Sequence, residues 1–439
     1  MSRKCLPTAS SLFRFRFALA KNLTAAILAL ALTCAPGWGQ QAARKPAVDF
    51  TRLVVLGDSL AAGFQNFSLF DSENKPDTPP GGQRHGFAAL IAQQAHADLN
   101  LPLVSLPGLP SALMLDSNDN IVRSPGNGLR EDPASQTMNL SVPSFTLANA
   151  IGYVVDPRNV TDGTSAMALT VLGYPGLLDP SRACGISPLP DGRIALSALT
   201  CALQLRPTTL LVDIGNNDAL SALTFGTPPV AASAFALNYA AIITSLRLTG
   251  ATIVAANIPN VTDIPFLTPV PDFIRHCRAV PAGAGPADFV VPNIIDPNAV
   301  SLDICTQYAV RSAALIAQTK AAVSAYNSII AKQAAKLGFP VVDVNGLFAR
   351  IARNGYNVGG RHLTTEFLGG IFSLDGIHPT NTGYAILANE WIKTMNQKLG
   401  TSLAEVPVAQ IAQTDPLILS NGTPGLRSAA EQLPFVGNK

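Results

Sequence analysis

The stretch Leu-Val-Val-Leu-Gly-Asp-Ser, from Leu53 to Ser59, is an apolar run that ends in a glycine and two polar residues. An unbroken apolar run containing β-branched valines is typical of a strand buried on both faces, as in a parallel sheet. The glycine marks the end of this strand, so Ser59 is predicted to stand on the turn that follows. A hydroxyl at that position faces the edge of the sheet where ligands bind.

Further apolar runs follow along the chain, and segments of helical composition alternate with them. This alternation predicts an α/β fold, a three-layer α/β/α sandwich with a central, mostly parallel five-stranded sheet. The strands are expected at Leu53–Gly57, Thr137–Val142, Leu210–Gly215, Thr252–Ile258 and Pro340–Val344. The helices are expected at Gly86–Ala97, Ser197–Leu205, Ala231–Leu248, Ala309–Lys336 and Gly383–Leu399.

Two stretches interrupt the alternation, at about residues 152–195 and 259–305. Each leaves the carboxyl end of a strand or the short helix after one, so we expect loop-rich insertions that wall a binding pocket. No obvious linker divides the chain, and residues 47–400 are therefore predicted to form one domain with these insertions. Residues 401–439 show little periodicity, which indicates a poorly ordered tail.

Residues 1–40 read differently, because basic residues precede the apolar run Ala25–Leu32 and small, turn-forming residues follow it. This order indicates a signal peptide, with cleavage expected near Gly39–Ala43. The run is shorter than the roughly 18–20 apolar residues of a spanning helix, so we expect no stable transmembrane anchor and a secreted or periplasmic protein. Thr33 stands where a lipidation site usually has a smaller residue, so we do not expect anchoring through Cys34.

The formal net charge is only +2, and no basic stripe suggests nucleic acid as a partner. The four cysteines that remain after cleavage would meet conditions in which disulfides persist. Sequence order favours the local pairs Cys184–Cys201 and Cys277–Cys305, but four cysteines allow three pairings, and free buried thiols are the alternative. No cysteine or histidine pair has the spacing of a zinc site, so we expect neither a metal nor another cofactor.

Near the other end of the chain, Asp375-Gly-Ile-His378-Pro379 places a carboxylate three residues before an imidazole. A turn can fold the carboxylate onto one ring nitrogen of His378 and leave the other nitrogen to take a proton from a serine. Each motif is common by itself, because Asp-x-x-His often begins a helix and Gly-Asp-Ser is often an ordinary turn. Together with a serine at a strand end, the pair predicts nucleophilic catalysis.

A third strand end supplies Gly215-Asn216-Asn217-Asp218, which would bring a side-chain amide to the same edge of the sheet. An amide N–H is a suitable donor to an oxyanion. The alternative is a Gly/Asn-rich turn that uses positive φ angles. Capping or strand-end hydrogen bonds are the expected roles of Asp58 and Asp218, and no chemistry is assigned to Asp213.

These three motifs, in this order, resemble those of the SGNH hydrolase superfamily, also called GDSL esterases and lipases. The resemblance extends from about Leu53 to Leu399 and implies the flavodoxin-like fold of that superfamily. It also implies that Ser59 is the nucleophile, His378 the general base and Asp375 its orienting partner. Asn217 and the N–H of Ser59 would then donate to the oxyanion.

The chain departs from the superfamily in the second motif, Asn-x-Gly/Ala/Ser-x-x-Gly, whose last glycine donates its N–H to the oxyanion. The corresponding residues are Asn139-Leu-Ser-Val-Pro-Ser144, with a serine in place of that glycine. Ser144 can serve as the donor if its backbone angles suit a residue other than glycine. Gly108 is the rival, because it keeps the glycine but lacks the preceding asparagine and strand; we favour Ser144.

The sequence thus predicts a secreted serine ester hydrolase that cleaves a small-molecule or lipid ester through an acyl-enzyme. The apolar loop Ile258–Leu267 favours an acyl pocket over a sugar site, although the same residues could be a core beneath an insertion. Two alternatives remain, a carbohydrate O-acetylesterase and a non-catalytic ligand-binding protein on the same scaffold. The sequence does not indicate an oligomeric state.

Overall fold

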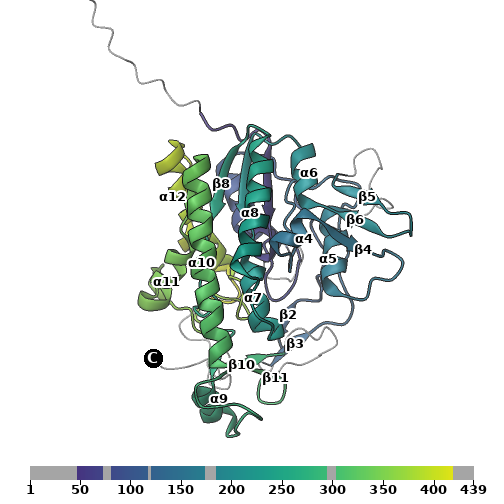
Figure 1. Ribbon diagram of the computed structural model, residues 1–439. Helices are drawn as coiled ribbons and strands as arrows, with labels where there is room; N and C mark the ends of the chain where they lie inside the picture. Colours follow the sequence, from purple (N-terminus) through teal and green to yellow (C-terminus); the bar gives the residue numbers. More distant parts are fainter. Residues whose placement is uncertain (1–46, 73–80, 117–119, 174–183, 294–302, 419–439) are drawn as a thin grey trace, which may run out of the picture. The chain divides into compact units, whose positions relative to one another are not determined.

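The structure is a computed structural model that describes residues 47–72, 81–116, 120–173, 184–293 and 303–418 (Figure 1). The expected signal peptide, its cleavage site and Cys34 lie outside the described residues, as do residues 419–439. Within the described ranges, no helix has both the length and the apolar character needed to cross a membrane.

A parallel sheet forms the centre of the fold, with the strand order β1-β7-β8-β12. Its strands are β1 (Leu53–Gly57), β7 (Thr209–Asp213), β8 (Thr252–Ala256) and β12 (Val341–Val342). β1 and β7 pair in register from Leu53 opposite Thr209 to Gly57 opposite Asp213. The two strands therefore end side by side, and the polar residues that follow them emerge at one edge of the sheet.

The fifth strand expected at Thr137–Val142 is not a regular strand, so the prediction of a five-stranded sheet is wrong on this point. The segment lies extended along β1, and Val55 donates its N–H to Met138 while accepting from Leu140. The N–H of Val142 donates to the carbonyl of Gly57 at 3.2 Å, so the segment follows β1 to its end, but the two share only an isolated bridge between Val55 and Asn139. On the side away from β1, the N–H of Ser141 bonds the side-chain oxygen of Asn139 at 3.2 Å, a local acceptor in place of a further strand.

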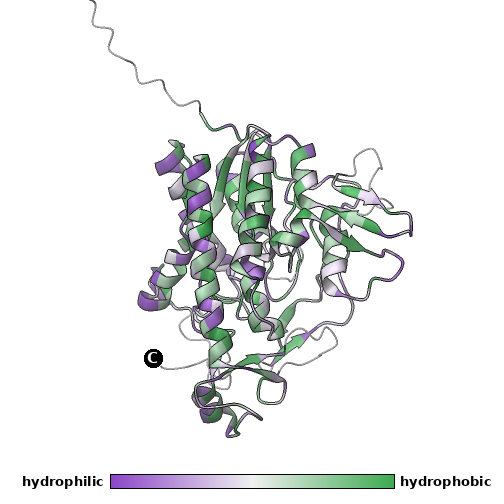
Figure 2. Ribbon diagram, in the orientation of Figure 1, coloured by the Kyte–Doolittle hydropathy of each residue, from purple (hydrophilic) through white to green (hydrophobic). Residues whose placement is uncertain are grey.

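Helices cover both faces of the sheet, which confirms the three-layer α/β/α prediction. Alternate strand residues point to opposite faces, so Val54 and Leu56 join one hydrophobic core while Leu53 and Val55 join the other. Figure 1 shows α8 and α10 side by side over one face, and Figure 2 shows the strands beneath them as mostly hydrophobic. The first layer holds α4 (Leu147–Ile151), α6 (Ala198–Gln204), α7 (Asn216–Phe225), α8 (Ala232–Arg247) and α10 (Ala313–Leu337). The second holds α3 (Phe87–Gln94), α11 (Val344–Asn354), α12 (Asn381–Leu399) and α13 (Val408–Thr414).

The two insertions are less loop-rich than the sequence suggests, because each contains a small antiparallel sheet and a helix. The first carries β4 (Tyr153–Val155), α5 (Gly163–Leu172), β5 (Ile186–Pro188) and β6 (Ile194–Leu196). The second carries β9 (Thr268–Pro269), α9 (Val270–Cys277), β10 (Phe289–Pro292) and β11 (Tyr308–Arg311). The remaining described elements are α2 (Ser59–Ala62), η1 (Gln83–His85), and the hairpins β2–β3 (Leu113–Leu115, Ile121–Arg123) and β13–β14 (Tyr356–Val358, Arg361–Leu363). Strands this short escape sequence patterns that need longer windows.

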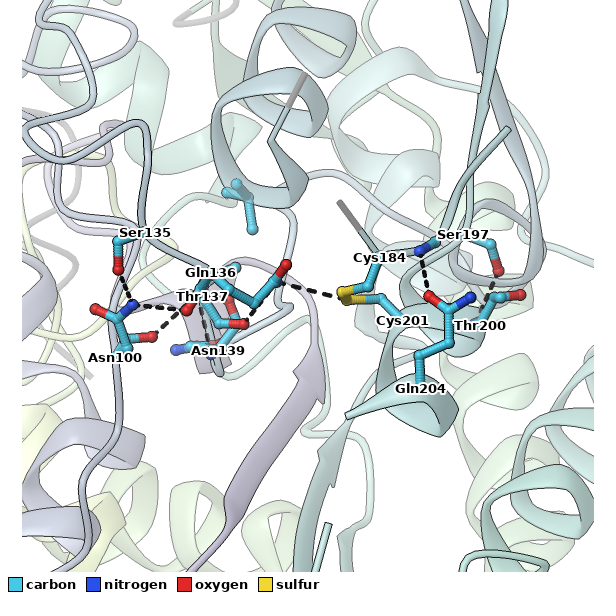
Figure 3. The surroundings of a disulfide bond; sticks show 12 residues. Asn100, Ser135, Gln136, Thr137, Asn139, Cys184, Ser197, Thr200, Cys201 and Gln204 are labelled. Atoms are coloured by element: carbon cyan, nitrogen blue, oxygen red, sulfur yellow. Dashed lines mark hydrogen bonds between the residues drawn. A yellow bond between two sulfur atoms is a disulfide. The ribbon is translucent and has the colours of Figure 1, made fainter. Parts of the chain in front are cut away.

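Each insertion is closed by one of the disulfides that sequence order favours, Cys184–Cys201 and Cys277–Cys305. Figure 3 shows that the first disulfide lies beside the segment that flanks β1, with the Gln136 amide 3.7 Å from the sulfur of Cys201. The first insertion is thus attached close to the edge of the central sheet.

The expectation of a poorly ordered tail from residue 401 is wrong as far as residue 418. The carboxylate of Asp415 accepts the backbone N–H and the hydroxyl of Thr382, both at 2.7 Å, at the start of α12. Buried apolar residues of α13 pack in the same core as α12. This docking depends on a contact with a distant helix, which local periodicity does not reveal.

Gly57 is required by close packing, because a Cβ built on it would lie 2.4 Å from Cβ of Ala61 and 2.6 Å from the carbonyl oxygen of Asp213. We predict that Gly57→Ala lowers the free energy of unfolding by about 2–3 kcal/mol, since strand and helix must separate. Gly163→Ala is the control, because its added methyl group would meet nothing closer than 3.9 Å. Urea unfolding of the two variants should differ by this amount, and equal stabilities would contradict the packing argument.

Candidate active site

Ser59 begins α2 directly after β1, so the strand and the helix fix its position together. The Asp58 side chain caps the helix by accepting the N–H of Leu60 at 3.3 Å. The Asn139 amide donates to the carbonyl of Ala61 at 2.8 Å, which ties α2 to the segment along β1. The nucleophile predicted from the sequence therefore stands on a short, well-anchored turn.

The segment Asp375–His378 forms the tight turn that its spacing suggests. One carboxylate oxygen of Asp375 accepts the backbone N–H groups of Ile377 and His378, each at 2.8 Å. The N–H of Ser373 donates to the carbonyl of His378 at 2.7 Å and closes the turn. Gly376 has φ +67°, a left-handed conformation that glycine adopts without strain. The turn thus holds the carboxylate and the imidazole on the same side of the chain.

The structure brings Ser59, His378 and Asp375 into one hydrogen-bonded row. Nε2 of His378 lies 2.8 Å from the Ser59 hydroxyl, and Nδ1 lies 2.9 Å from Oδ2 of Asp375. Ser59 is 7% exposed, whereas His378 and Asp375 are 4% and 1% exposed. The ring of Phe64 stands edge-on to His378 with centroids 4.8 Å apart. This arrangement can move a proton from the serine to a neutral imidazole that the carboxylate orients.

The carboxylate of Asp375 is held ionised although it is buried. Burial acts to raise its pKa, but the neighbouring His378 and the hydrogen bonds from His378 and Ile377 outweigh burial and lower the pKa below its ordinary value. Hydrogen bonds to the charged form are a recognised cause of such a shift. An ionised carboxylate can stabilise the imidazolium that forms when His378 takes a proton.

Two of the expected oxyanion donors, Ser144 and Asn217, are brought together by a hydrogen bond from the Asn217 amide to the carbonyl of Phe145 at 3.0 Å. Ser144 has φ +69°, a left-handed conformation that glycine adopts more easily than serine, so the expected condition, that its backbone angles suit a residue other than glycine, is not met. Among the described residues, the backbone N–H groups of Ser59 and Ser144 have no acceptor. These two backbone donors are free to bind a developing negative charge, and the Asn217 amide has a second N–H besides the one bonded to Phe145.

Gly108, the rival donor, is engaged elsewhere. Its N–H donates to the carbonyl of Ser105 at 3.0 Å, within a turn between two cis prolines. An N–H that already has an acceptor cannot serve an oxyanion without rearrangement. Ser144 is therefore the better candidate.

Asp58 and Asp213 form a buried acidic pair behind Ser59. The Asn216 amide reaches both carboxylates, at 3.0 Å and 3.1 Å from the oxygens of Asp58 and 3.4 Å from Asp213. Burial raises the pKa of both groups, and the charge of Asp213 raises that of Asp58 further. Two carboxyls so close cannot both ionise easily, so the pair favours retaining a proton.

We predict that this pair makes the folded state less stable as pH rises from the ordinary carboxyl pKa of about 4 through neutrality. The sign follows because a raised folded-state pKa means that the folded state binds the proton more tightly than the unfolded state. Asp213→Asn, which keeps an oxygen acceptor for Asn216, should make stability vary less with pH over this range. Urea unfolding from pH 5 to pH 9 measures the effect, and parallel curves for wild type and variant would contradict it.

Other polar residues of the motifs serve the framework. Asp218 accepts the N–H of Leu147 at the start of α4 at 3.0 Å.

In the described part of the chain, His276, Cys277 and Cys305 form a group compact enough for a metal ion, with ligand atoms within 4.8 Å of one another. Both of those sulfurs are joined in a disulfide.

Sequence reasoning missed the neighbours of the triad. Phe64 contacts the His378 ring, and the backbone N–H of Phe67 donates to Oδ2 of Asp375 at 2.7 Å. A backbone donor leaves no trace in side-chain chemistry. The only signal was the position of both residues shortly after the Ser59 motif.

The fold and the arrangement at this strand edge agree with one protein family. The family described as GDSL-like Lipase/Acylhydrolase matches residues 53–391, so the chain belongs to that family. The chain is accordingly a hydrolase of carboxylic esters. The match includes the motifs around Ser59, Asn217 and His378.

No curated protein matches the chain in sequence. Among solved structures, it is similar to a lipase/acylhydrolase from Enterococcus faecalis, at 11% identity and a TM-score of 0.33 over 81% of this chain and 98% of that one. It is also similar to a phospholipase A1 from Streptomyces albidoflavus NA297, at 13% identity and a TM-score of 0.32 over 79% and 98%. An alpha/beta hydrolase enzyme from the metagenome of Lake Arreo, Spain, matches at 11% identity and a TM-score of 0.37 over 79% and 95%.

Proposed function

We propose that the protein is an exported serine esterase in which Ser59 attacks the ester carbonyl and His378 accepts its proton. The observation that carries this proposal is the 2.8 Å contact between the serine hydroxyl and an imidazole that bonds a buried carboxylate on its other nitrogen. The order of basic, apolar and small residues in residues 1–40 supports export.

The reaction would proceed in two stages. Attack by Ser59 gives a tetrahedral oxyanion, which the N–H groups of Ser59 and Ser144 and the Asn217 amide would stabilise. The alcohol leaves with the proton held on His378, and a serine-bound acyl-enzyme remains. Water, activated by the same imidazole, then releases the acid and restores the serine.

We propose esters with an apolar acyl chain as the substrate class. The ring of Phe67 supports this choice, because it is partly exposed and stands edge-on to Phe64, the ring that contacts His378, with centroids 5.8 Å apart. The loop Ile258–Leu267 no longer supports it strongly. Three of its residues are buried in the core, namely Ile258, Val261 and Phe266. This agrees with the alternative interpretation of the sequence, in which the loop forms a core beneath an insertion.

The proposed function is tested with p-nitrophenyl esters of increasing acyl length. The wild type should hydrolyse them, with higher kcat/KM for longer chains, while Ser59→Ala should fall to background because the nucleophile is lost. Equal rates for the two proteins would overturn the proposal. A preference limited to acetyl esters, with release of acetate from acetylated xylan, would replace the substrate class by a carbohydrate O-acetylesterase.

The oxyanion donors give a second prediction. Asn217→Ala should lower kcat on the order of 100-fold to 1,000-fold, because the amide donor is lost. Ser144→Gly is the matched control, since it keeps the backbone N–H and relaxes a left-handed residue, and it should stay within about threefold of the wild type. Steady-state kinetics would contradict this assignment if the glycine variant lost as much activity as Asn217→Ala.

A further inference from the structure

A two-residue turn after the Ser59 motif reaches across to the Asp375 turn. Gln65 and Ser68 exchange both backbone hydrogen bonds at 3.0 Å, and the central residues Asn66 and Phe67 have φ +51° and +55°. These angles are typical of a type I′ turn, which usually contains glycine. Asparagine tolerates the left-handed region, but phenylalanine seldom occupies it. Such a conformation persists only where surrounding contacts hold it, often beside a functional site.

The tip of this turn bonds three consecutive residues that end at the carboxylate. Asn66 donates its N–H to the hydroxyl of Ser373 at 3.0 Å and accepts the N–H of Leu374 through its side chain at 3.1 Å. Phe67 donates its N–H to Oδ2 of Asp375 at 2.7 Å. The residues joined lie about 300 positions apart in the chain, so the contacts fix one segment relative to the other.

The donor from Phe67 completes the hydrogen bonding of the Asp375 carboxylate. Oδ1 accepts the two N–H groups of the Asp375–His378 turn, and Oδ2 accepts the His378 ring and the Phe67 N–H. A buried carboxylate needs such donors to remain charged. The Phe67 bond is the only one of the four that comes from outside the segment Asp375–His378, so it ties the carboxylate itself directly to the turn that follows the Ser59 motif.

The base and the side chains of the turn are also held. The Gln65 amide accepts the N–H of Gly82 at 3.0 Å and donates to the Asn381 side chain at 3.1 Å. The guanidinium of Arg123 lies 5.1 Å from the centroid of the Phe67 ring, within the range of a cation–π contact. The turn is therefore supported on both sides of its tip.

We propose that the turn Gln65–Ser68 is a positioning element, in which the backbone N–H of Phe67 holds the Asp375 carboxylate in line with His378. This inference rests on the proposed triad. The backbone N–H of Phe67 acts through Asp375 and His378 and touches no reacting atom, so loss of this N–H, with the ring retained, should impair the chemical step without preventing substrate binding.

The direct test replaces the Phe67 amide by an ester, incorporating phenyllactic acid so that only the N–H is exchanged for oxygen. A hydrogen bond to a charged group is lost, so kcat should fall on the order of 10-fold while KM changes less than about twofold. With one donor fewer, the carboxylate holds the imidazolium proton more tightly. The acid limb of kcat/KM should therefore move up by about one pH unit or less.

The matched control is the same ester exchange at Leu69, whose N–H donates to the carbonyl of Leu109 at 3.0 Å in the same loop. It removes an ordinary backbone bond and should leave both kcat and the acid limb unchanged. Equal kcat and pH profiles for the Phe67 ester and the wild type would overturn the proposal. So would identical changes in the two ester variants, because the effect would then be general loosening of the loop.

A second pair of variants tests the turn if the ester protein does not fold. Asn66→Ala disfavours the left-handed conformation and should lower kcat with little change in KM, whereas Asn66→Gly permits that conformation and should recover part of the loss. Wild-type kcat in both variants would overturn the proposal. Labelling of Ser59 by a fluorophosphonate separates the two hypotheses, since an unlabelled wild type refutes the proposed function itself, and a labelled, active Phe67 ester with normal kcat refutes only the positioning role.

Discussion

The hydrogen bond between Ser59 and His378 is the contact on which the rest of this site depends, and it joins residues 319 positions apart. Only a fold that brings the first strand and the start of the last long helix to one edge can form it. The parallel pairing of β1 with β7 and the close approach at Gly57 set the serine, while α12 begins just after His378. The strand edge therefore assembles the site from distant segments.

The charges of the buried carboxyl groups at this edge of the sheet depend on hydrogen bonds and on neighbouring charges. Asp375 stays ionised because the neighbouring His378 and the hydrogen-bond donors outweigh burial. Asp58 also accepts several hydrogen bonds, from the N–H groups of Leu60 and Asn216 and from the Asn216 amide, yet burial and the charge of Asp213 raise its pKa. An opposite charge nearby therefore keeps one buried carboxylate ionised, whereas a like charge favours a retained proton on the pair. Asp375 thus carries its negative charge where an imidazolium would need it.

The sequence predicted the parts of this structure that local patterns encode. Buried strands such as Leu53–Gly57, the long helices and the turn Asp375–His378 have short-range signatures, and the two disulfides join cysteines adjacent in sequence order. The features that the sequence did not predict depend on contacts between residues far apart in the chain. The segment Thr137–Val142 follows β1 through an isolated bridge and not as a regular strand, residues 401–418 dock through Asp415, and the Phe67 N–H finds its acceptor across the chain. None of these contacts changes the local periodicity.

The central claim is that an acyl group passes through Ser59, and mass spectrometry of the protein quenched during turnover of a slowly hydrolysed ester tests it most directly. The account predicts one acyl group per chain, located on the peptide that contains Ser59 and released when the substrate is removed. An acyl group on another residue, or steady hydrolysis without any covalent adduct, would contradict the account.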